Sequence, residues 1–153
     1  MEGYYHASCL DYKIGDNVKD YYGTIIKDRR FYTFNDQNHS QYLREMIFEK
    51  VRLKSFPNLP SRLDSIYMCL NETDSISYAK QLNYIVYEVE FMESHGNILK
   101  ADMSWIDYSL RKSYEELEDI AYKYFSGQST DRPFWEFLFD GEVKAKRVIR
   151  GPF

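Results

Sequence analysis

Alternation of hydrophobic and polar residues is clearest at residues 84–91, which read YIVYEVEF. The run is rich in β-branched and aromatic side chains, which pack well on a pleated surface, so it predicts a strand. A shorter run, YYHAS at residues 4–8, predicts another strand, and Gly15-Asp16 predicts a turn after it.

A helical spacing of apolar residues runs through SQYLREMIFEKVRLK, residues 40–54. We expect this helix to begin near Asn38 or Ser40 and to end before Pro57, because a proline disfavours helical backbone in the residue before it. The tyrosine-rich, charged stretch that precedes the helix predicts a loop.

The next segment predicts a strand, a turn and a short helix, in that order. The strand is expected at about residues 65–70, after two prolines that disfavour helix. Residues 71–74 predict the turn, and Thr73 or Asp74 can cap a helix that runs to about Leu82.

Two signals organise the last third of the chain. Ser113 and Glu116 form a capping-box pattern that opens a helix, and Gly127 marks its end. Farther on, the runs FWEFLF and EVKAKRVI flank Asp140-Gly141, which predicts a hairpin or a bulge. Strands distributed among short helices, without a regular βαβ rhythm, predict an α+β fold.

The length and composition of the chain indicate its number of domains and the kinds of site it can form. With 44% hydrophobic residues, residues 1–153 are expected to form a single domain with one sizeable core. Aromatic residues make up 18% of the chain, enough to line a stacking pocket as well as a core. The net charge of -4 weighs against a protein that coats phosphate backbones, although KDRR at 27–30 and KAKRVIR at 144–150 are basic patches.

The cysteine content and the hydropathy of the sequence indicate the compartment in which the protein is expected. The chain has two cysteines and no CxxC pair, which argues against a disulfide-stapled secreted domain and favours the reducing cytoplasm. No basic segment followed by an apolar run opens the sequence, and no stretch approaches the roughly 18 apolar residues of a membrane helix. We therefore expect no membrane association.

Several common catalytic motifs are absent from the sequence. The seven glycines are never closer than eight residues apart, so neither a GxGxxG motif nor a Walker loop is present, and a Rossmann dinucleotide site is excluded. His6 and Cys9 are three apart on a predicted strand and would point to opposite faces, which disfavours both a zinc pair and a Cys-His nucleophile. No metal site is predicted.

The remaining candidate chemistry lies in three segments. They are His6 in YYHAS, Tyr67 with Ser75 and Tyr78 in IYMCLNETDSISY, and Glu136 in WEFLFDGEVKAKRVI. In order and spacing they resemble the His-Tyr-Glu branch of the ADP-ribosyltransferase superfamily, which includes poly(ADP-ribose) polymerases and rifampin ADP-ribosyltransferases. The most specific part is a strand tyrosine followed by serine eight residues later and by a second tyrosine eleven residues later, as in the polymerases.

The resemblance covers most of the chain, except for residues 20–62 and 96–127. The continuation of the first strand into KIGDNV and the run YIVYEVE are similar to the rifampin enzymes. The sequence departs from the family at Ala7, where the family has glycine. It departs again at Phe134, where arginine-modifying relatives carry glutamate or glutamine, and this departure speaks against transfer to arginine.

The resemblance implies an ADP-ribosyltransferase-like split antiparallel β-sheet core with flanking short helices, and NAD+ as co-substrate without a metal. Its catalytic residues would be Glu136, Tyr67 and His6. Glu136 would stabilise the oxocarbenium-like ribose that forms as nicotinamide leaves. His6 would hydrogen-bond the adenosine ribose, and Arg62 would neutralise the diphosphate.

Further cofactor contacts follow from the same resemblance. Tyr67 and Tyr78 would sandwich the planar nicotinamide ring. The hydroxyl of Ser75 and the backbone at Ala7 would hold its carboxamide. The expected cofactor-binding residues are therefore His6, Ala7, Ser8, Arg62, Tyr67, Ser75 and Tyr78.

The loop GQSTDRPFW, residues 127–135, precedes Glu136 as the acceptor-recognition turn does in relatives. A flat apolar face such as Phe134 can stack a base or an aromatic ring but cannot hydrogen-bond a guanidinium. The residues expected to recognise the acceptor are Gln128, Arg132, Phe134 and Trp135.

The implied function is that of a NAD+-dependent mono-ADP-ribosyltransferase, used as a bacterial toxin or defence effector against a macromolecule. Nucleic acid is slightly favoured over protein as the acceptor, and an antitoxin or immunity partner is left open. The alternatives are a NAD+ glycohydrolase, a small-molecule (antibiotic) ADP-ribosyltransferase and a noncatalytic binding domain of the same fold. If the resemblance is accidental, the same side chains are ordinary core and surface residues.

Overall fold

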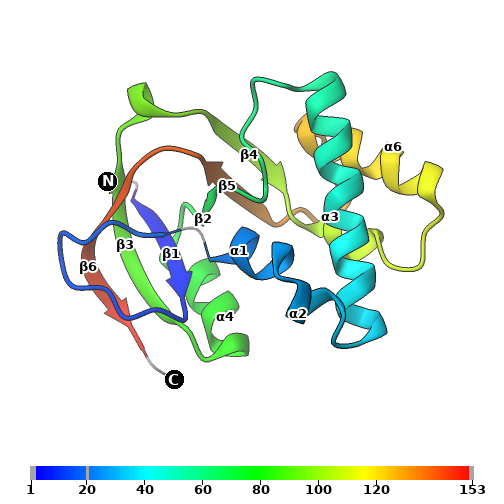
Figure 1. Cartoon of the computed structure of the whole chain (residues 1–153). Coiled ribbons are helices and arrows are strands. Elements are labelled where there is room, and N and C mark those ends of the chain that lie inside the picture. Colours follow the sequence, from blue (N-terminus) through cyan, green and yellow to red (C-terminus); the bar gives the residue numbers. More distant parts are fainter. Residues whose placement is uncertain (1–2, 20, 152–153) are drawn as a thin grey trace.

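The computed structural model describes residues 3–19 and 21–151, which form a mixed α+β fold with two small antiparallel sheets (Figure 1). The first sheet has the order β1-β3-β6, with bounds Tyr4–Ser8, Ile85–Phe91 and Val143–Arg150. The second sheet has the order β2-β5-β4, with bounds Ile66–Met68, Trp135–Phe139 and Ile98–Asp102. The predicted α+β class is confirmed.

Helices cover the outer face of the second sheet and the junction of the two sheets. α3 (Asp36–Ser55) and α6 (Tyr114–Phe125) pack on the second sheet, and α4 (Glu72–Leu82) packs beside β1 (Figure 1). The shorter elements are α1 (Tyr22–Lys27), α2 (Arg29–Tyr32), α5 (Ser104–Tyr108) and the 3-10 turn η1 (Glu93–His95). In the part of the chain that the structure describes, no helix is both long and apolar enough to span a bilayer.

Strand alternation gives the second sheet a core on each face. On β5, Phe137 and Phe139 pack against the first sheet, whereas Leu138 belongs to the core formed with α3 and α6. Glu136 shares the helix-facing side with Leu138, because side chains two apart on a strand point the same way. Tyr67 of β2 is paired directly with Leu138. Tyr67 and Glu136 therefore lie on the same face of the sheet.

The two sheets meet where β1 passes the end of β2. The backbone N–H of Tyr5 donates to the carbonyl of Cys69 at 2.9 Å, and the N–H of Cys69 donates back to the carbonyl of Tyr5 at 2.8 Å. This bridge holds the next residue of β1, His6, beside β2.

Caps set the helix boundaries, and two of them differ from the prediction. α3 begins at Asp36, earlier than expected, because the side chain of Asn35 caps its first turn. α4 is capped by Asn71, whose side chain accepts a hydrogen bond from the N–H of Asp74, so the predicted cap at Thr73 or Asp74 is wrong. The capping box predicted for α6 is confirmed.

The stretch predicted as a tyrosine-rich loop contains two helices, α1 and α2, so that prediction is wrong. These helices have six and four residues, respectively. Elements this short do not complete enough turns to show a hydrophobic period, and they depend on packing for their stability.

Asp140-Gly141 does not form the predicted hairpin. β5 and β6 belong to different sheets, so the turn carries the chain from one sheet to the other. The carboxylate of Asp140 accepts a hydrogen bond from the N–H of Asn97 at 2.7 Å. A Cβ on Gly96 would lie 2.7 Å from the backbone nitrogen of Gly141. The glycines therefore allow two loops to approach closely.

Candidate functional site

A cavity of about 170 Å³ opens where β1, β2, α1, α4 and the start of β5 meet. His6, Tyr67, Ser75, Tyr78 and Glu136 all line it. The structure thus brings together five side chains that come from three separate sequence segments. The volume far exceeds the roughly 10–15 Å³ that one water molecule needs, so the cavity has room for part of an organic ligand.

His6 is anchored by its Nδ1 atom, which lies 2.6 Å from the carbonyl oxygen of Tyr67. A carbonyl only accepts hydrogen bonds, so Nδ1 carries the hydrogen and donates it. Burial lowers the pKa of His6, although the hydrogen bond to Tyr67 acts in the opposite direction. The ring is therefore neutral at pH 7, and Nε2 is an unprotonated acceptor.

Glu136 is 5% exposed and is held by one of its two carboxylate oxygens. The hydroxyl of Tyr124 donates to Oε1 at 2.7 Å, and Nη1 of Arg62 donates to the same atom at 3.2 Å. Burial, together with the nearby Glu45, raises the pKa of Glu136 above its ordinary value, although Arg62 and the hydrogen bond from Tyr124 lower it. No hydrogen bond from another described residue reaches Oε2.

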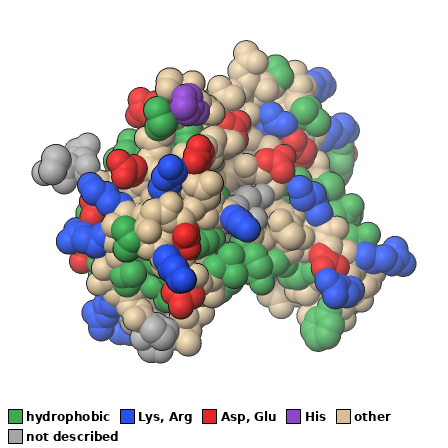
Figure 2. All heavy atoms as spheres, turned by 60° about the vertical axis from the view of Figure 1, so that its left-hand side comes forward, with side chains coloured by type: hydrophobic (Ala, Val, Ile, Leu, Met, Phe, Trp, Pro, Cys, Tyr) green, Lys and Arg blue, Asp and Glu red, His purple; other side chains and the backbone are tan. Residues whose placement is uncertain are grey.

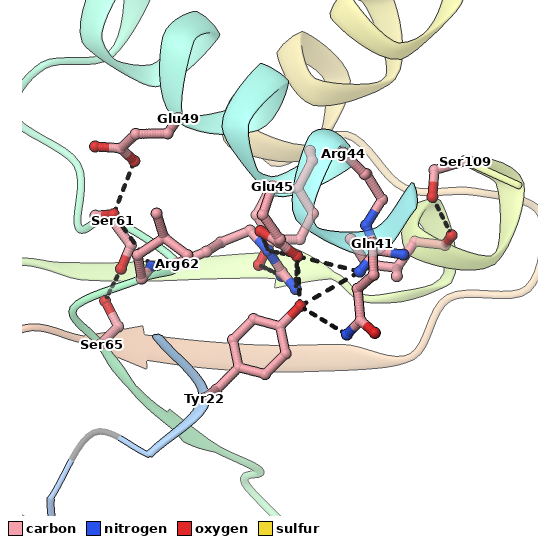
Figure 3. A network of polar contacts seen from close by, with 12 residues as sticks. Tyr22, Gln41, Arg44, Glu45, Glu49, Ser61, Arg62, Ser65 and Ser109 are labelled. Carbon is pink, nitrogen blue, oxygen red and sulfur yellow. Dashed lines mark hydrogen bonds and ion pairs between the residues drawn. The ribbon is translucent and has the colours of Figure 1, made fainter. Parts of the chain in front are cut away.

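Arg62 belongs to a buried network of two arginines and two glutamates, much of which is drawn in Figure 3. Its Nε lies 2.9 Å from Oε2 of Glu45, and Arg44 approaches Oε1 of Glu45 at 3.2 Å. Tyr22 of α1 donates its hydroxyl hydrogen to Glu45 at 2.7 Å. Burial alone would raise the pKa of Glu45, but Arg62 and Arg44 together bring it below its ordinary value. The charges of the two arginines and of ionised Glu45 and Glu136 cancel.

This network changes the role expected for Arg62. The resemblance implies a contact with the diphosphate of a cofactor, but the side chain is 7% exposed and its guanidinium is directed to Glu45, Glu136 and Tyr124. Arg62 therefore positions Glu136 and is not available as a free cation.

The other expected cofactor residues lie on three elements around the cavity. Tyr67 donates its hydroxyl to the carbonyl of Arg62, and its ring packs edge-on against Tyr22 with 5.6 Å between centroids. Burial and the nearby Glu136 raise the pKa of Tyr78 to about 12. Ser75 is 1% exposed, and its Oγ makes no hydrogen bond to another described residue.

Ala7 and Ser8 of β1 also line the cavity. Ala7 is paired with Val86 of β3, which fixes its backbone. The Oγ of Ser8 accepts a hydrogen bond from the N–H of Leu10 at 3.0 Å. The hydroxyl hydrogen of Ser8 remains able to donate.

Of the four residues expected to recognise an acceptor, only Phe134 is among the described residues that line the cavity. Gln128 and Arg132 are exposed and lie outside the lining. Trp135 faces the opposite side of β5, where Nζ of Lys100 lies 4.8 Å from its ring centroid. The structure therefore does not bring these four side chains to one place.

A buried carboxylate holds the loop that carries Phe134. Asp102 accepts hydrogen bonds from the N–H and the hydroxyl of Thr130 at 2.7 Å each, and from the N–H groups of Phe134 and Ser104 at 2.9 Å each. These bonds lower the pKa of Asp102 even though burial alone raises it. The adjacent Met103 donates its N–H to the carbonyl of Phe134 at 2.8 Å, and both residues line the cavity.

Sequence reasoning missed the supporting residues, which are Tyr22, Glu45, Asp102 and Tyr124. One signal was available for Glu45, which falls on the same helical stripe as Phe48 and Val51, and all three are buried. An acidic side chain within an apolar stripe requires a buried cation or donor as partner.

One family model, described as "Protein of unknown function (DUF2441)", matches residues 4–150. The chain belongs to this family. The match spans the segments of the DUF2441 chain that line the cavity, from Tyr5 to Glu136. Comparison with curated proteins gives no match. Among the described residues of this DUF2441 chain, no three His, Cys, Asp or Glu side chains lie close enough together to hold a metal ion.

Proposed function

We propose that this DUF2441 chain is a NAD+-dependent mono-ADP-ribosyltransferase whose cavity binds NAD+ and cleaves the bond between nicotinamide and ribose. One observation carries the proposal. His6, Tyr67, Ser75, Tyr78 and Glu136 resemble the residues of the His-Tyr-Glu branch in order and spacing, and all five line one cavity. An accidental match in sequence gives no reason for these side chains to converge.

The fold is compatible with this proposal. A split antiparallel sheet is the core that the resemblance implies, and two three-stranded sheets joined at Tyr5 and Cys69 fit that description. The segments outside the resemblance supply α1, α3 and α6, whose side chains Tyr22, Glu45 and Tyr124 support the cavity.

The proposed reaction uses the neutrality of nicotinamide as a leaving group. The ribose–nitrogen bond breaks, and its electron pair moves to the nicotinamide nitrogen. A nucleophilic atom of the acceptor then bonds to the same ribose carbon and loses its proton to solvent. The carboxylate of Glu136 stabilises the positive ribose by its charge and by a hydrogen bond to a hydroxyl. Because Tyr124 and Arg62 hold Oε1, Oε2 is the atom proposed to face the ribose.

Recognition of NAD+ is assigned to the aromatic and polar lining of the cavity. Tyr67 and Tyr78 provide faces for the nicotinamide ring. Ser75 and the backbone of Ala7 bind the carboxamide. The Nε2 atom of His6 accepts a hydrogen bond from the adenosine ribose, since its Nδ1 is committed to a backbone carbonyl.

For the acceptor we propose a nucleic acid. Phe134 and Met103 form an apolar wall on which a base can stack. The positive charge of the basic strand β6 is partly balanced within the chain, because Arg147 and Lys146 lie 2.7 and 3.7 Å from Glu88 and Lys144 lies 3.7 Å from Glu142. Figure 2 likewise shows Lys and Arg side chains interspersed with Asp and Glu on the face drawn. Acceptor recognition is therefore assigned to the cavity.

The first test measures nicotinamide released from NAD+ by the purified protein, alone and with cell lysate. The wild type is expected to release nicotinamide. Glu136→Gln is expected to lower the rate by roughly 100-fold or more while NAD+ still binds, because the charge acts mainly in the transition state. Glu142→Gln alters an exposed glutamate and should keep the wild-type rate. No release by the wild type under either condition would favour a noncatalytic binding domain.

Labelled NAD+ separates transfer from the alternatives. After incubation with lysate, the labelled macromolecules are digested with nuclease or with protease. Loss of the label on nuclease digestion supports the proposed nucleic-acid acceptor, and its loss on protease digestion indicates a protein acceptor. Nicotinamide release without macromolecular label indicates a NAD+ glycohydrolase or transfer to a small molecule such as an antibiotic. A role as a cytoplasmic toxin or defence effector with an antitoxin or immunity partner extends the proposal, and it rests on the resemblance alone.

A further inference from the structure

We infer that Lys19 binds the diphosphate of the cofactor, an inference that rests on the proposed function. The diphosphate of NAD+ carries two negative charges at neutral pH. Such a group is bound by positively charged side chains and hydrogen-bond donors. The described lining of the cavity includes two side chains that carry positive charge at pH 7, Arg62 and Lys19.

Arg62 does not fill this role, because its charge is already balanced. Its guanidinium lies 2.9 Å from Glu45 and 3.2 Å from Glu136. Moving it toward a phosphate would take the ion-pair partner from buried Glu136 and one of the two arginine partners from buried Glu45, which is strongly unfavourable. The free positive charge of the described lining therefore belongs to Lys19.

The backbone at Lys19 is held in place while its side chain is exposed. The N–H of Lys19 donates to the hydroxyl of Tyr12 at 3.1 Å, and the N–H of Tyr12 donates to the hydroxyl of Tyr87 at 2.9 Å. Val18 is buried, and its N–H donates to the carbonyl of Val143 at 2.8 Å. No ion pair joins Lys19 to another described residue.

Ser8 supplies a second group of suitable chemistry. It lines the same cavity, and its Oγ already accepts the N–H of Leu10. Its hydroxyl hydrogen can therefore donate to a phosphate oxygen. Lys19 and Ser8 together offer one charge and one hydroxyl donor to the diphosphate.

The test uses ADP and nicotinamide, which represent the two halves of the cofactor, with wild type, Lys19→Gln, Lys19→Arg and Lys13→Gln. Lys13 is the matched control, because it is an exposed lysine of the same loop that does not line the cavity. Calorimetry with ADP gives dissociation constants that do not depend on catalysis. Inhibition of nicotinamide release by nicotinamide reports the other half of the site.

Lys19→Gln should raise the dissociation constant of ADP and the KM for NAD+ about tenfold, the effect expected for one charge-assisted hydrogen bond. The kcat and the inhibition constant of nicotinamide should stay at the wild-type values. Lys19→Arg should restore most of the affinity, and Lys13→Gln should behave as the wild type. Equal ADP affinity in Lys19→Gln and Lys13→Gln would overturn the assignment of Lys19.

The role of Lys19 and the proposed function can be tested separately. If the wild type releases nicotinamide and Lys19→Gln binds ADP as tightly as the wild type, the role of Lys19 is wrong but the proposed function is not contradicted. If the wild type neither binds ADP nor cleaves NAD+, both the proposed function and the assignment of Lys19 are contradicted. Melting temperatures equal to that of the wild type would show that the variants are folded, as expected for an exposed side chain.

Discussion

The hydroxyl of Tyr124 lies 2.7 Å from Oε1 of Glu136 and donates a hydrogen bond to it. Tyr124 is on α6 and Glu136 is on β5, so this bond ties the helical layer to the strand that carries the proposed catalytic carboxylate. The same hydroxyl accepts a hydrogen bond from Nη1 of Arg62 at 2.7 Å. Two buried residues thus fix one oxygen of Glu136.

Tyr124→Phe should lower the free energy of unfolding by about 1–3 kcal/mol, because buried groups of Arg62 and Glu136 each lose one hydrogen bond. The rate of nicotinamide release should fall roughly tenfold, because a less well oriented Glu136 would stabilise the transition state by about 1.4 kcal/mol less. Tyr122→Phe, on the exposed side of the same helix, is the control and should change neither quantity. Wild-type activity in Tyr124→Phe would show that the bond to Glu136 has no part in catalysis.

Ser75→Ala should weaken NAD+ binding without weakening the fold. The Oγ of Ser75 makes no hydrogen bond to another described residue, so its removal costs no bond within the described chain. Loss of one hydrogen bond to the carboxamide should raise the KM for NAD+ about fivefold to tenfold. Ser77→Ala, an exposed serine on the same helix, should leave both KM and melting temperature unchanged. An unaltered KM in Ser75→Ala would argue that the carboxamide binds elsewhere.

Phe134→Ala should impair transfer to the acceptor more than NAD+ hydrolysis, because Phe134 lines the cavity from the acceptor loop and is absent from the proposed cofactor contacts. Phe134→Glu should not improve the native reaction. The ratio of incorporated label to released nicotinamide measures the effect, with the exposed Phe34→Ala as control. Efficient and specific modification of protein arginine by the wild type would contradict this view of Phe134.

NAD+ should protect Cys9 from alkylation. Cys9 is exposed and lines the cavity, whereas burial raises the pKa of Cys69 to about 12, so the thiolate of Cys69 is scarce at pH 8. Mass spectrometry of iodoacetamide-treated protein should show slower modification at Cys9 when NAD+ is saturating, in the wild type and in Cys69→Ser. Alkylation at the same rate with NAD+ bound would place the cofactor outside this cavity.

The stability of the protein should fall as the pH drops below about 6.5, partly because of His6. Burial lowers the pKa of His6 from 6.5 in the folded chain, so the unfolded chain takes up a proton that the folded chain does not. The contribution of neutral His6 to the free energy of unfolding is fully present above pH 6.5. As the pH falls from 6.5 toward the lowered pKa, this contribution decreases by at most about 1.4 kcal/mol per pH unit. Melting temperatures between pH 7.5 and 5 should fall less in His6→Gln than in the exposed control His39→Gln. Parallel curves would mean that His6 does not titrate as proposed.

The secondary structure of the site residues could be predicted where it depends on the local sequence pattern. The sequence predicted strands that contain His6 and Tyr67 and an extended run, FWEFLF, that contains Glu136, and the structure has these strands as β1, β2 and β5. Ser75 and Tyr78 were expected in one short helix that runs to about Leu82, and both lie on α4 and line the cavity. In each case the conformation depends on neighbours within a few residues.

Features that depend on contacts between distant segments were not predictable in the same way. Asp140-Gly141 has the composition of a hairpin turn, but β5 pairs with β2 and β4 because its Phe137 and Leu138 are buried on opposite faces of the second sheet. Arg62 was expected to neutralise a diphosphate, and only the fold places Glu45 beside it. Local sequence does not encode such pairings, because the partners lie on elements that meet only in the folded chain.

The proposed function requires that the cavity bind NAD+ with its nicotinamide ribose at Glu136. A crystal structure of the Glu136→Gln variant with NAD+ tests it most directly, since this variant is expected to bind the cofactor and cleave it slowly. We expect the nicotinamide ring within about 4 Å of the Tyr67 and Tyr78 rings, a ribose hydroxyl at the side chain of residue 136, and the diphosphate at Lys19. NAD+ bound outside this cavity, or an empty cavity at saturating NAD+, would contradict it.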